Sequence, residues 1–255
     1  MIDIHTHILP ETDDGARDLE ESLGMARVAV EDGIASIVAT PHAGPGNTVT
    51  KGCITEKVAA LQKALDESGI PVKLYAGAEV YIDLDLARMI AEERAFTING
   101  GRYLLLELPF QQYPLYTEQV IFELQIRGIN VIIAHPERNT AIQDDPNRVA
   151  DLVHHGVLMQ ITSSSLLGDF GARVQKVAET MLQRGFGHII SSDAHSLYFR
   201  PPTLSQAVDH AAKFVGRIEA EAMVTKTPQA ILANRVISVA EPVGDRSRLI
   251  RPDRR

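Results

Sequence analysis

The sequence has little cysteine, no tryptophan and no long apolar run. Its one cysteine, Cys53, cannot form an internal disulfide, and it excludes a zinc site built from several thiolates. Cytoplasmic localisation follows as the default expectation. With Phe and Tyr also scarce, a stacking platform for single-stranded nucleic acid is disfavoured. No segment approaches the roughly 18–20 apolar residues of a membrane span, and the opening MIDIHTH has no basic region, so we expect neither membrane insertion nor a secretory signal.

Most of the chain also carries a net negative charge. The formal charge of the 255 residues is −8, but residues 245–255 carry five Arg and two Asp, which leaves the rest of the chain near −11. An acidic body disfavours nucleic acid as a partner. A phosphate anion could bind only where positive charge is supplied locally. We expect residues 239–255 to form a disordered basic tail after one domain at residues 1–238.

Seven short β-branched-rich runs predict strands. They lie at residues 2–4, 36–39, 73–76, 103–106, 130–134, 157–161 and 188–191. Amphipathic stretches between them predict helices, and five of these stretches end in glycine just before the next strand, at Gly33, Gly69, Gly128, Gly156 and Gly185. This repeated order is typical of βα units on a parallel sheet. It favours one closed or nearly closed α/β barrel, with an open doubly wound sheet as the alternative.

Metal-ligating residue types gather at the predicted strand ends. In a parallel barrel the carboxyl ends of all strands lie on one face, and ligands bind at that face. Histidine and carboxylate are the usual ligands of Mn, Fe, Zn or Mg. Together with one aspartate in the first loop, nine candidates result: His5, His7, Asp14, His42, Glu79, Glu107, His135, Asp193 and His195. A tetrahedral zinc takes about four ligands, so nine predict two or three ions.

Two arginines follow these candidates in the chain. Arg138 lies three residues after His135, and Arg200 lies five after His195. A guanidinium group is suited to binding phosphate oxygens in a fork, so both are candidate phosphate ligands. The remaining histidines, His154, His155, His188 and His210, fall on helices or at the opposite end of a strand, and we leave them out of the site.

The ordered motifs HTH, DDG, ATPH, GAEV, LLLELP, AHPERN, SSDAH and RPP resemble those of the PHP (polymerase and histidinol phosphatase) superfamily. Within it, the chain is similar to the bacterial capsular and exopolysaccharide tyrosine-protein phosphatases. The resemblance runs from residue 1 to about residue 234. After His42 the chain has the sequence AGPGN, which differs from the sequences of its relatives. This difference affects the residues expected around the substrate and not the metal ligands.

The resemblance implies a distorted (β/α)₇ barrel that binds three divalent ions, commonly Mn²⁺, with Fe, Co, Zn or Mg as other options. It implies the nine candidates above as metal ligands, Asp14 in preference to Asp13, and Glu107 as a bridging ligand with a catalytic role. It implies that Arg138 and Arg200 hold the phosphate. The implied substrate is phosphotyrosine on the tail of a bacterial tyrosine autokinase that controls capsule or exopolysaccharide assembly.

The mechanism we expect is metal-assisted hydrolysis of a phosphate monoester, in which a hydroxide bridging two ions attacks phosphorus in line. A cysteine nucleophile is excluded because Cys53 lacks the arginine six residues later; residue 59 is Ala. Alternatives are a histidinol-phosphate phosphatase, a metallo-amidohydrolase or TatD-like nuclease, and a non-catalytic regulatory partner. The amidohydrolase is disfavoured because no Lys occupies a central strand end. The sequence leaves the oligomeric state open.

Overall fold

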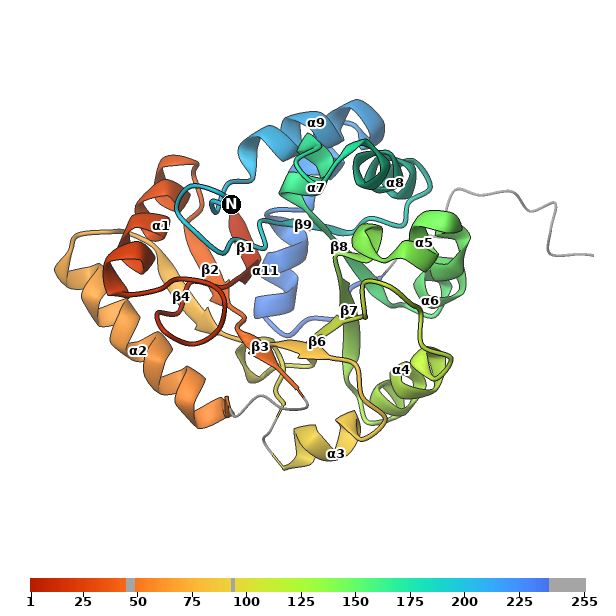
Figure 1. The fold of residues 1–255 in the computed structure, drawn as a ribbon, viewed down its shortest axis with the longest axis horizontal. Helices are drawn as coiled ribbons and strands as arrows, with labels where there is room; N and C mark the ends of the chain where they lie inside the picture. Colours follow the sequence, from red (N-terminus) through yellow and green to blue (C-terminus); the bar gives the residue numbers. More distant parts are fainter. Residues whose placement is uncertain (45–48, 93–94, 239–255) are drawn as a thin grey trace, which may run out of the picture.

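The computed structural model describes residues 1–44, 49–92 and 95–238. Within these residues the chain forms a mixed α/β fold with two parallel sheets, and most of the helices lie around the outside of the strands (Figure 1). The first sheet has the order β1-β2-β4, and the second has the order β3-β5-β6-β7-β8-β9. The strands span β1 Ile2–Thr6, β2 Ser36–Ala39, β3 His42–Ala43, β4 Lys73–Ala76, β5 Glu79–Tyr81, β6 Tyr103–Glu107, β7 Asn130–Ala134, β8 Leu158–Thr162 and β9 Ile189–Ser191.

All seven predicted strands are present, and two of them continue after a break. β3 follows β2 across residues 40–41, and β5 follows β4 across residues 77–78. Pro41 has no N–H to donate to a ladder. Gly77 lies so close to β2 that a Cβ there would stand 2.7 Å from Val38 Cγ1. These breaks pass the chain from the first sheet to the second and bring His42 opposite Glu79 in the new register.

The helices follow the predicted pattern. The longer ones are α1 Leu19–Glu31, α2 Lys51–Glu67, α4 Thr117–Ile126, α8 Ala172–Gln183 and α9 Ser205–Val215; the shorter ones are α3 Leu86–Ala91, α5 Thr140–Asp144, α6 Ala150–His154, α7 Ser163–Leu167, α10 Arg217–Ala222 and α11 Lys226–Leu232, with 3₁₀ turns η1 Ile98–Gly100, η2 Pro136–Arg138 and η3 Pro146–Val149. The Asp18 carboxylate accepts from the Glu21 N–H and so begins α1. The five glycines predicted after helices all have positive φ, as a left-handed helix end requires.

Two apolar layers cover the two faces of the sheets. Strand residues such as Ile37, Leu104 and Ile133 pack outward against the helices. A smaller inner layer comprises Ile4, Val38, Ile98, Tyr103, Leu105, Ile132, Ala134, Leu158, Ile189 and Ile231. Its members come from strands of both sheets and from α11, which lies behind the strands in Figure 1. The two sheets therefore share one buried interior.

Hydrogen bonds join the first and last strands beyond their carboxyl ends. The Asp193 N–H donates to the His5 carbonyl at 2.9 Å, and the His7 N–H donates to the Ala194 carbonyl at 2.8 Å. A parallel bridge pairs Thr6 with Ala194. The ends of β1 and β9 therefore lie side by side. No helix among the described residues has the length and apolarity required to cross a membrane. The predicted basic tail lies outside the described residues, as do residues 45–48 of the loop after His42.

His188, directly before β9, is a histidine whose buried imidazole makes the stability of the fold depend on pH. Its Nδ1 accepts from the Met159 N–H at 3.0 Å, its Nε2 is buried without a partner, and burial lowers the pKa of the imidazole to about 4. The unfolded chain titrates near pH 6.5, so the unfolded state takes up the proton first as the pH falls. Stability from neutral His188 is therefore complete above about pH 6.5 and is lost as the pH falls towards 4.

We expect His188→Asn to make the free energy of unfolding less sensitive to acid, since Asn Oδ1 can accept the same hydrogen bond without titrating. Between pH 6.5 and 4 the wild type should lose about 2 kcal/mol more than the variant. Urea denaturation of both proteins across this range measures the difference. Parallel pH profiles would contradict the assignment.

Candidate metal centre

The structure brings all nine predicted ligands together. They lie at the carboxyl ends of β1, β6 and β7, at the first residues of β3 and β5, in the loop after β1 and in the segment after β9. Their ligating atoms form four overlapping groups in the part of the chain that the structure describes, with the atoms of each group within 4.8 Å of one another. The groups are His7–Asp14–His42–His195, His5–His7–Asp193, His5–Glu79–His135 and His42–Glu79–Glu107.

Glu79 lies at the centre of this cluster. Its Oε2 is 3.3 Å from both His5 Nε2 and His7 Nε2 and 2.9 Å from His42 Nδ1, and its Oε1 is 2.7 Å from His135 Nε2. The side chain is fully buried. Burial alone would raise the pKa of Glu79, but the surrounding imidazoles, His5 above all, hold it well below its usual value. Glu79 belongs to two groups and Glu107 to one, so the structure makes Glu79 the more central carboxylate.

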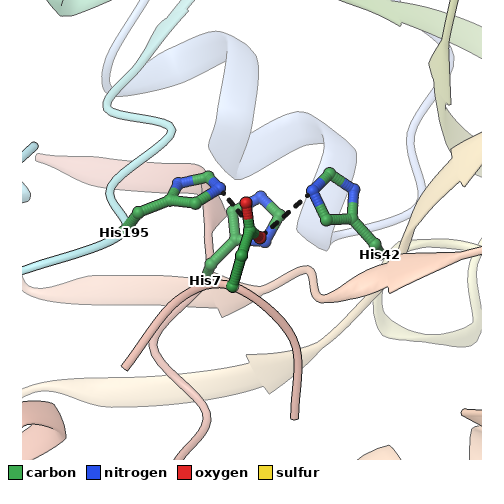
Figure 2. A group of neighbouring side chains, drawn as sticks. His7, His42 and His195 are labelled. Atoms are coloured by element: carbon green, nitrogen blue, oxygen red, sulfur yellow. Dashed lines mark ion pairs between the residues drawn. The ribbon is translucent and has the colours of Figure 1, made fainter. Parts of the chain in front are cut away.

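The loop after β1 adds a carboxylate on the solvent side. Asp14 Oδ1 is 3.4 Å from both His42 Nε2 and His195 Nε2. Figure 2 shows His42 and His195 on either side of His7, with their ring nitrogens directed towards the same carboxylate. Gly15 permits this arrangement because a Cβ there would lie 2.1 Å from the His7 carbonyl oxygen. The DDG motif can therefore fold back tightly against the end of β1.

Groups behind the histidines fix their tautomers. His7 Nδ1 donates to Asp13 Oδ2 at 2.7 Å, His5 Nδ1 to Gln160 Oε1 at 2.9 Å, and His195 Nδ1 to the Asp193 carbonyl at 2.9 Å. Each Nε2 lone pair is then free to face the cluster, the arrangement that metal-ligating histidines require. Burial opposes ionisation of Asp13, but the hydrogen bond from His7 lowers its pKa to about 2.

The cluster attracts positive charge. Burial would lower the pKa of His7, but Asp13, Asp193 and Glu79 raise it well above its usual value. His195 behaves differently, because burial and the neighbouring His7 lower its pKa to about 4. For Glu107, burial and the charge of Glu79 raise the pKa. The carboxylates thus draw protons onto buried imidazoles, and a site with this imbalance suits multivalent cations.

Two of the candidates have positive φ, a conformation that is uncommon for residues other than glycine. His135 has φ 33° and Asp193 has φ 51°. Such conformations cost roughly 1–3 kcal/mol each and persist where the surroundings enforce them. The His135 carbonyl accepts a hydrogen bond from the Arg138 N–H at 2.9 Å, and the Asp193 N–H donates to the His5 carbonyl at 2.9 Å. From this left-handed backbone, the side chains of both residues reach the cluster.

Arg138 and Arg200 lie beside the cluster. Arg138 Nη1 donates to Asp193 Oδ2 at 2.7 Å, and Arg200 Nη2 donates to the same oxygen. Both line a pocket of about 100 Å³ with eight other residues, Asp14, His42, Glu79, Glu107, Phe110, His135, Asp193 and His195. The pocket therefore combines metal-ligating groups with two cations of the kind that bind phosphate.

The four histidines left out of the site are indeed elsewhere. His154 and His155 are exposed at the end of α6, and His210 pairs with Glu179 at 2.9 Å. His188 lies at the amino end of β9, away from the pocket.

Comparison with known proteins places these features in one family. Residues 1–233 match the model of the family described as "Capsular polysaccharide synthesis, CpsB/CapC". The chain belongs to the CpsB/CapC family. It is 37% identical to the tyrosine-protein phosphatase YwqE of Bacillus subtilis over 93% of both chains, and 30% identical to the tyrosine-protein phosphatase CpsB of Streptococcus pneumoniae over 93% of this chain and all of that one.

A solved member of the CpsB/CapC family has the same fold. It comes from crystal structures of Bacillus subtilis YwqE and Streptococcus pneumoniae CpsB, described as unique metal-dependent tyrosine phosphatases. The TM-score is 0.90 at 36% identity, and the match covers 95% of this chain and 98% of the other. The resemblance inferred from the motifs is therefore confirmed.

Sequence reasoning missed the residues that support the candidate ligands in this CpsB/CapC chain. Asp13 was considered as a ligand and set aside, yet it orients His7 and also accepts from the His42 N–H at 3.0 Å. Gln160, on β8, is distant in sequence from every motif, and only the sheet register brings it to His5. Phe170 was also missed, although its ring contacts both arginines. A carboxylate next to the predicted ligand was the only available signal.

Proposed function

We propose that this chain is a metal-dependent protein-tyrosine phosphatase. The observation that carries the proposal is the convergence of five imidazoles and four carboxylates in one cluster. Three of these imidazoles, all four carboxylates and two arginines line the same pocket. Its homologues, named tyrosine-protein phosphatases, share most of its length. Capsule or exopolysaccharide synthesis is the process that the family description supports.

The ligand set fits a cluster of divalent ions. Donor atoms about 2.0–2.2 Å from one ion lie roughly 3.0–3.5 Å from each other. His5 Nε2 and His7 Nε2 are 3.2 Å apart, and Asp193 Oδ1 is 3.3 and 3.5 Å from them. In addition, Glu79 Oε2 is buried with no hydrogen bond of good geometry, although three imidazole nitrogens lie 2.9–3.3 Å from it. A cation shared by these atoms would satisfy all of them.

Three ions account for the four overlapping groups. The Nδ1 atoms of His5 and His7 are already hydrogen-bonded, so each ring has one nitrogen left and serves one ion. We assign His5, His7 and Asp193 to one ion, Glu107 and His135 to a second, and Asp14, His42 and His195 to a third. Glu79 would serve the first two ions, because its Oε2 faces His5 and His7 and its Oε1 faces His135. Mn²⁺ is the proposed metal, and Fe, Co, Zn and Mg ions suit the same donors. A bridging role for Glu107 remains part of the proposal.

Bound divalent ions would polarise the phosphoryl oxygens and make water a stronger nucleophile at neutral pH. The protein's own contribution is positioning. Arg138 and Arg200 can donate to the equatorial phosphate oxygens and so stabilise the charge of the transition state. Phe110, with its ring 5.4 Å from that of His135, gives the pocket an aromatic wall. The phenolate of tyrosine, whose pKa is near 10, is a tolerable leaving group.

The fold supports a closed (β/α)₇ barrel as the scaffold. β2 with β3, and β4 with β5, each count as one strand of seven. The hydrogen bonds between the ends of β1 and β9, together with the shared interior of the two sheets, support closure. As the physiological partner we propose the phosphotyrosine tail of a bacterial tyrosine kinase, met in the cytoplasm.

The proposal predicts a metal-dependent monoesterase. Purified protein with Mn²⁺ should hydrolyse p-nitrophenyl phosphate, thorough chelation should remove at least about 99% of the turnover, and added Mn²⁺ should restore it. A phosphotyrosine peptide, a phosphoserine peptide and histidinol phosphate are then compared by released phosphate. Activity that survives chelation would refute the metal requirement, and a preference for histidinol phosphate would refute the substrate assignment.

A further inference from the structure

The two arginines of the pocket share one neutralising group. Arg138 Nη1 and Arg200 Nη2 both donate to Asp193 Oδ2. Asp193 Oδ1 faces His5 and His7, so the same carboxylate also belongs to the proposed metal cluster. One carboxylate cannot neutralise two guanidinium groups and ligate an ion as well. The pair therefore keeps net positive charge, and two like charges held this close need another source of stabilisation.

Aromatic rings supply contacts to both cations. The guanidinium carbon of Arg138 lies 4.6 Å from the centre of the Phe110 ring and 4.6 Å from the centre of the Phe170 ring. The guanidinium carbon of Arg200 lies 5.7 Å from the Phe170 ring centre. All three distances fall within the range of cation–π attraction. Phe170 is thus the ring common to both arginines.

Phe170 is held in place by its own turn. It lies between α7 and α8 in the sequence Gly168-Asp169-Phe170-Gly171, and both glycines have positive φ, 89° and 93°. The Asp169 N–H donates to the Ser164 carbonyl at 3.0 Å, and the Gly171 N–H donates to the Gly168 carbonyl at 2.9 Å. The turn fixes Phe170 against the arginines, whereas Phe110 is the ring that lines the pocket.

We propose that Phe170 is a positioning residue that holds Arg138 and Arg200 ready for the phosphate dianion. An aromatic face attracts a guanidinium without neutralising it, because the ring carries a quadrupole and no net charge. A second carboxylate in this place would order the arginines equally well but would compete with the phosphate. The ring therefore orders the two cations and leaves their charge available. This inference rests on the proposed function, since it assumes that these arginines bind phosphate.

The test compares Phe170→Leu, which keeps an apolar side chain without a ring, with Phe170→Tyr, which keeps the ring. Phe214→Leu, a half-buried phenylalanine on α9, is the matched control. For each Mn²⁺-loaded protein, calorimetry gives the Kd of inorganic phosphate, and p-nitrophenyl phosphate kinetics give KM and kcat. Elemental analysis gives metal content. We expect Phe170→Leu to weaken phosphate binding and raise KM by about three- to tenfold, with metal content unchanged and kcat altered by less than about twofold. Phe170→Tyr and Phe214→Leu should behave as wild type.

Unchanged phosphate affinity in Phe170→Leu would overturn the inference. Equal weakening in Phe170→Leu and Phe170→Tyr would also overturn it, since the ring would not be the cause. The proposed function fails separately, if the wild type binds phosphate but shows no turnover; the affinities of the variants then still decide the role of Phe170. A wild-type protein that binds no phosphate overturns both.

Discussion

Glu79→Gln should abolish phosphatase activity and remove bound metal. The substitution keeps the shape of the side chain but replaces an anionic carboxylate with a neutral amide at the point where four imidazoles meet. Gln offers one weakly ligating oxygen, so it cannot serve ions on both sides. We expect kcat/KM to fall at least about a thousandfold, equivalent to about 4 kcal/mol of transition-state stabilisation. Metal content should fall by at least one ion per chain.

Glu123→Gln is the matched control for this prediction. Glu123 is a half-buried residue on α4 that pairs with Arg127 at 3.0 Å and does not line the pocket, so its substitution removes the same charge away from the site. Its activity and metal content should equal those of the wild type. Circular dichroism of Glu79→Gln distinguishes loss of the site from loss of the fold. Full metal content with wild-type turnover in Glu79→Gln would refute the central place of this carboxylate.

The residues that gather at the strand ends could be predicted because their residue types alone indicate metal binding. Buried carboxylates and histidines that follow apolar runs are costly without a partner, and parallel strands bring their carboxyl ends to one face. These two facts sufficed to select His5, Glu79 and Asp193 as neighbours. The glycines after the helices marked the βα units for a similar reason, since a left-handed residue there strongly favours Gly.

What the sequence left open depends on register and on local backbone. The breaks after β2 and β4 arise from Pro41 and from the close approach of Gly77 to Val38, a contact between strands far apart in sequence. The choice between Asp13 and Asp14 follows from the turn at Gly15, which directs Asp13 behind His7 and Asp14 towards His42. Phe170 reaches the arginines only through the fold of the segment between α7 and α8. None of these contacts leaves a periodic trace in the sequence.

Removal of the two arginines should slow turnover while the metals stay bound. Charge-assisted hydrogen bonds to a phosphate are worth about 1.5–3 kcal/mol each, so Arg138→Ala and Arg200→Ala should each lower kcat/KM by about 10- to 100-fold. Each single variant leaves Asp193 Oδ2 with one guanidinium donor. The double variant leaves this buried oxygen with none, which costs about 1–3 kcal/mol more.

The shared oxygen therefore predicts coupling between the two sites. Each single variant should retain its metals and its wild-type free energy of unfolding to within about 1 kcal/mol, whereas the double variant should lose more stability than the two single losses combined. Arg127→Ala, at an exposed residue directly after α4, controls for the loss of a guanidinium group. Kinetics, elemental analysis and urea denaturation are measured on the wild type, the two single variants, the double variant and the control. Full turnover in Arg138→Ala with its metals bound would refute the phosphate-binding role, and additive stability losses would refute the coupling through Asp193.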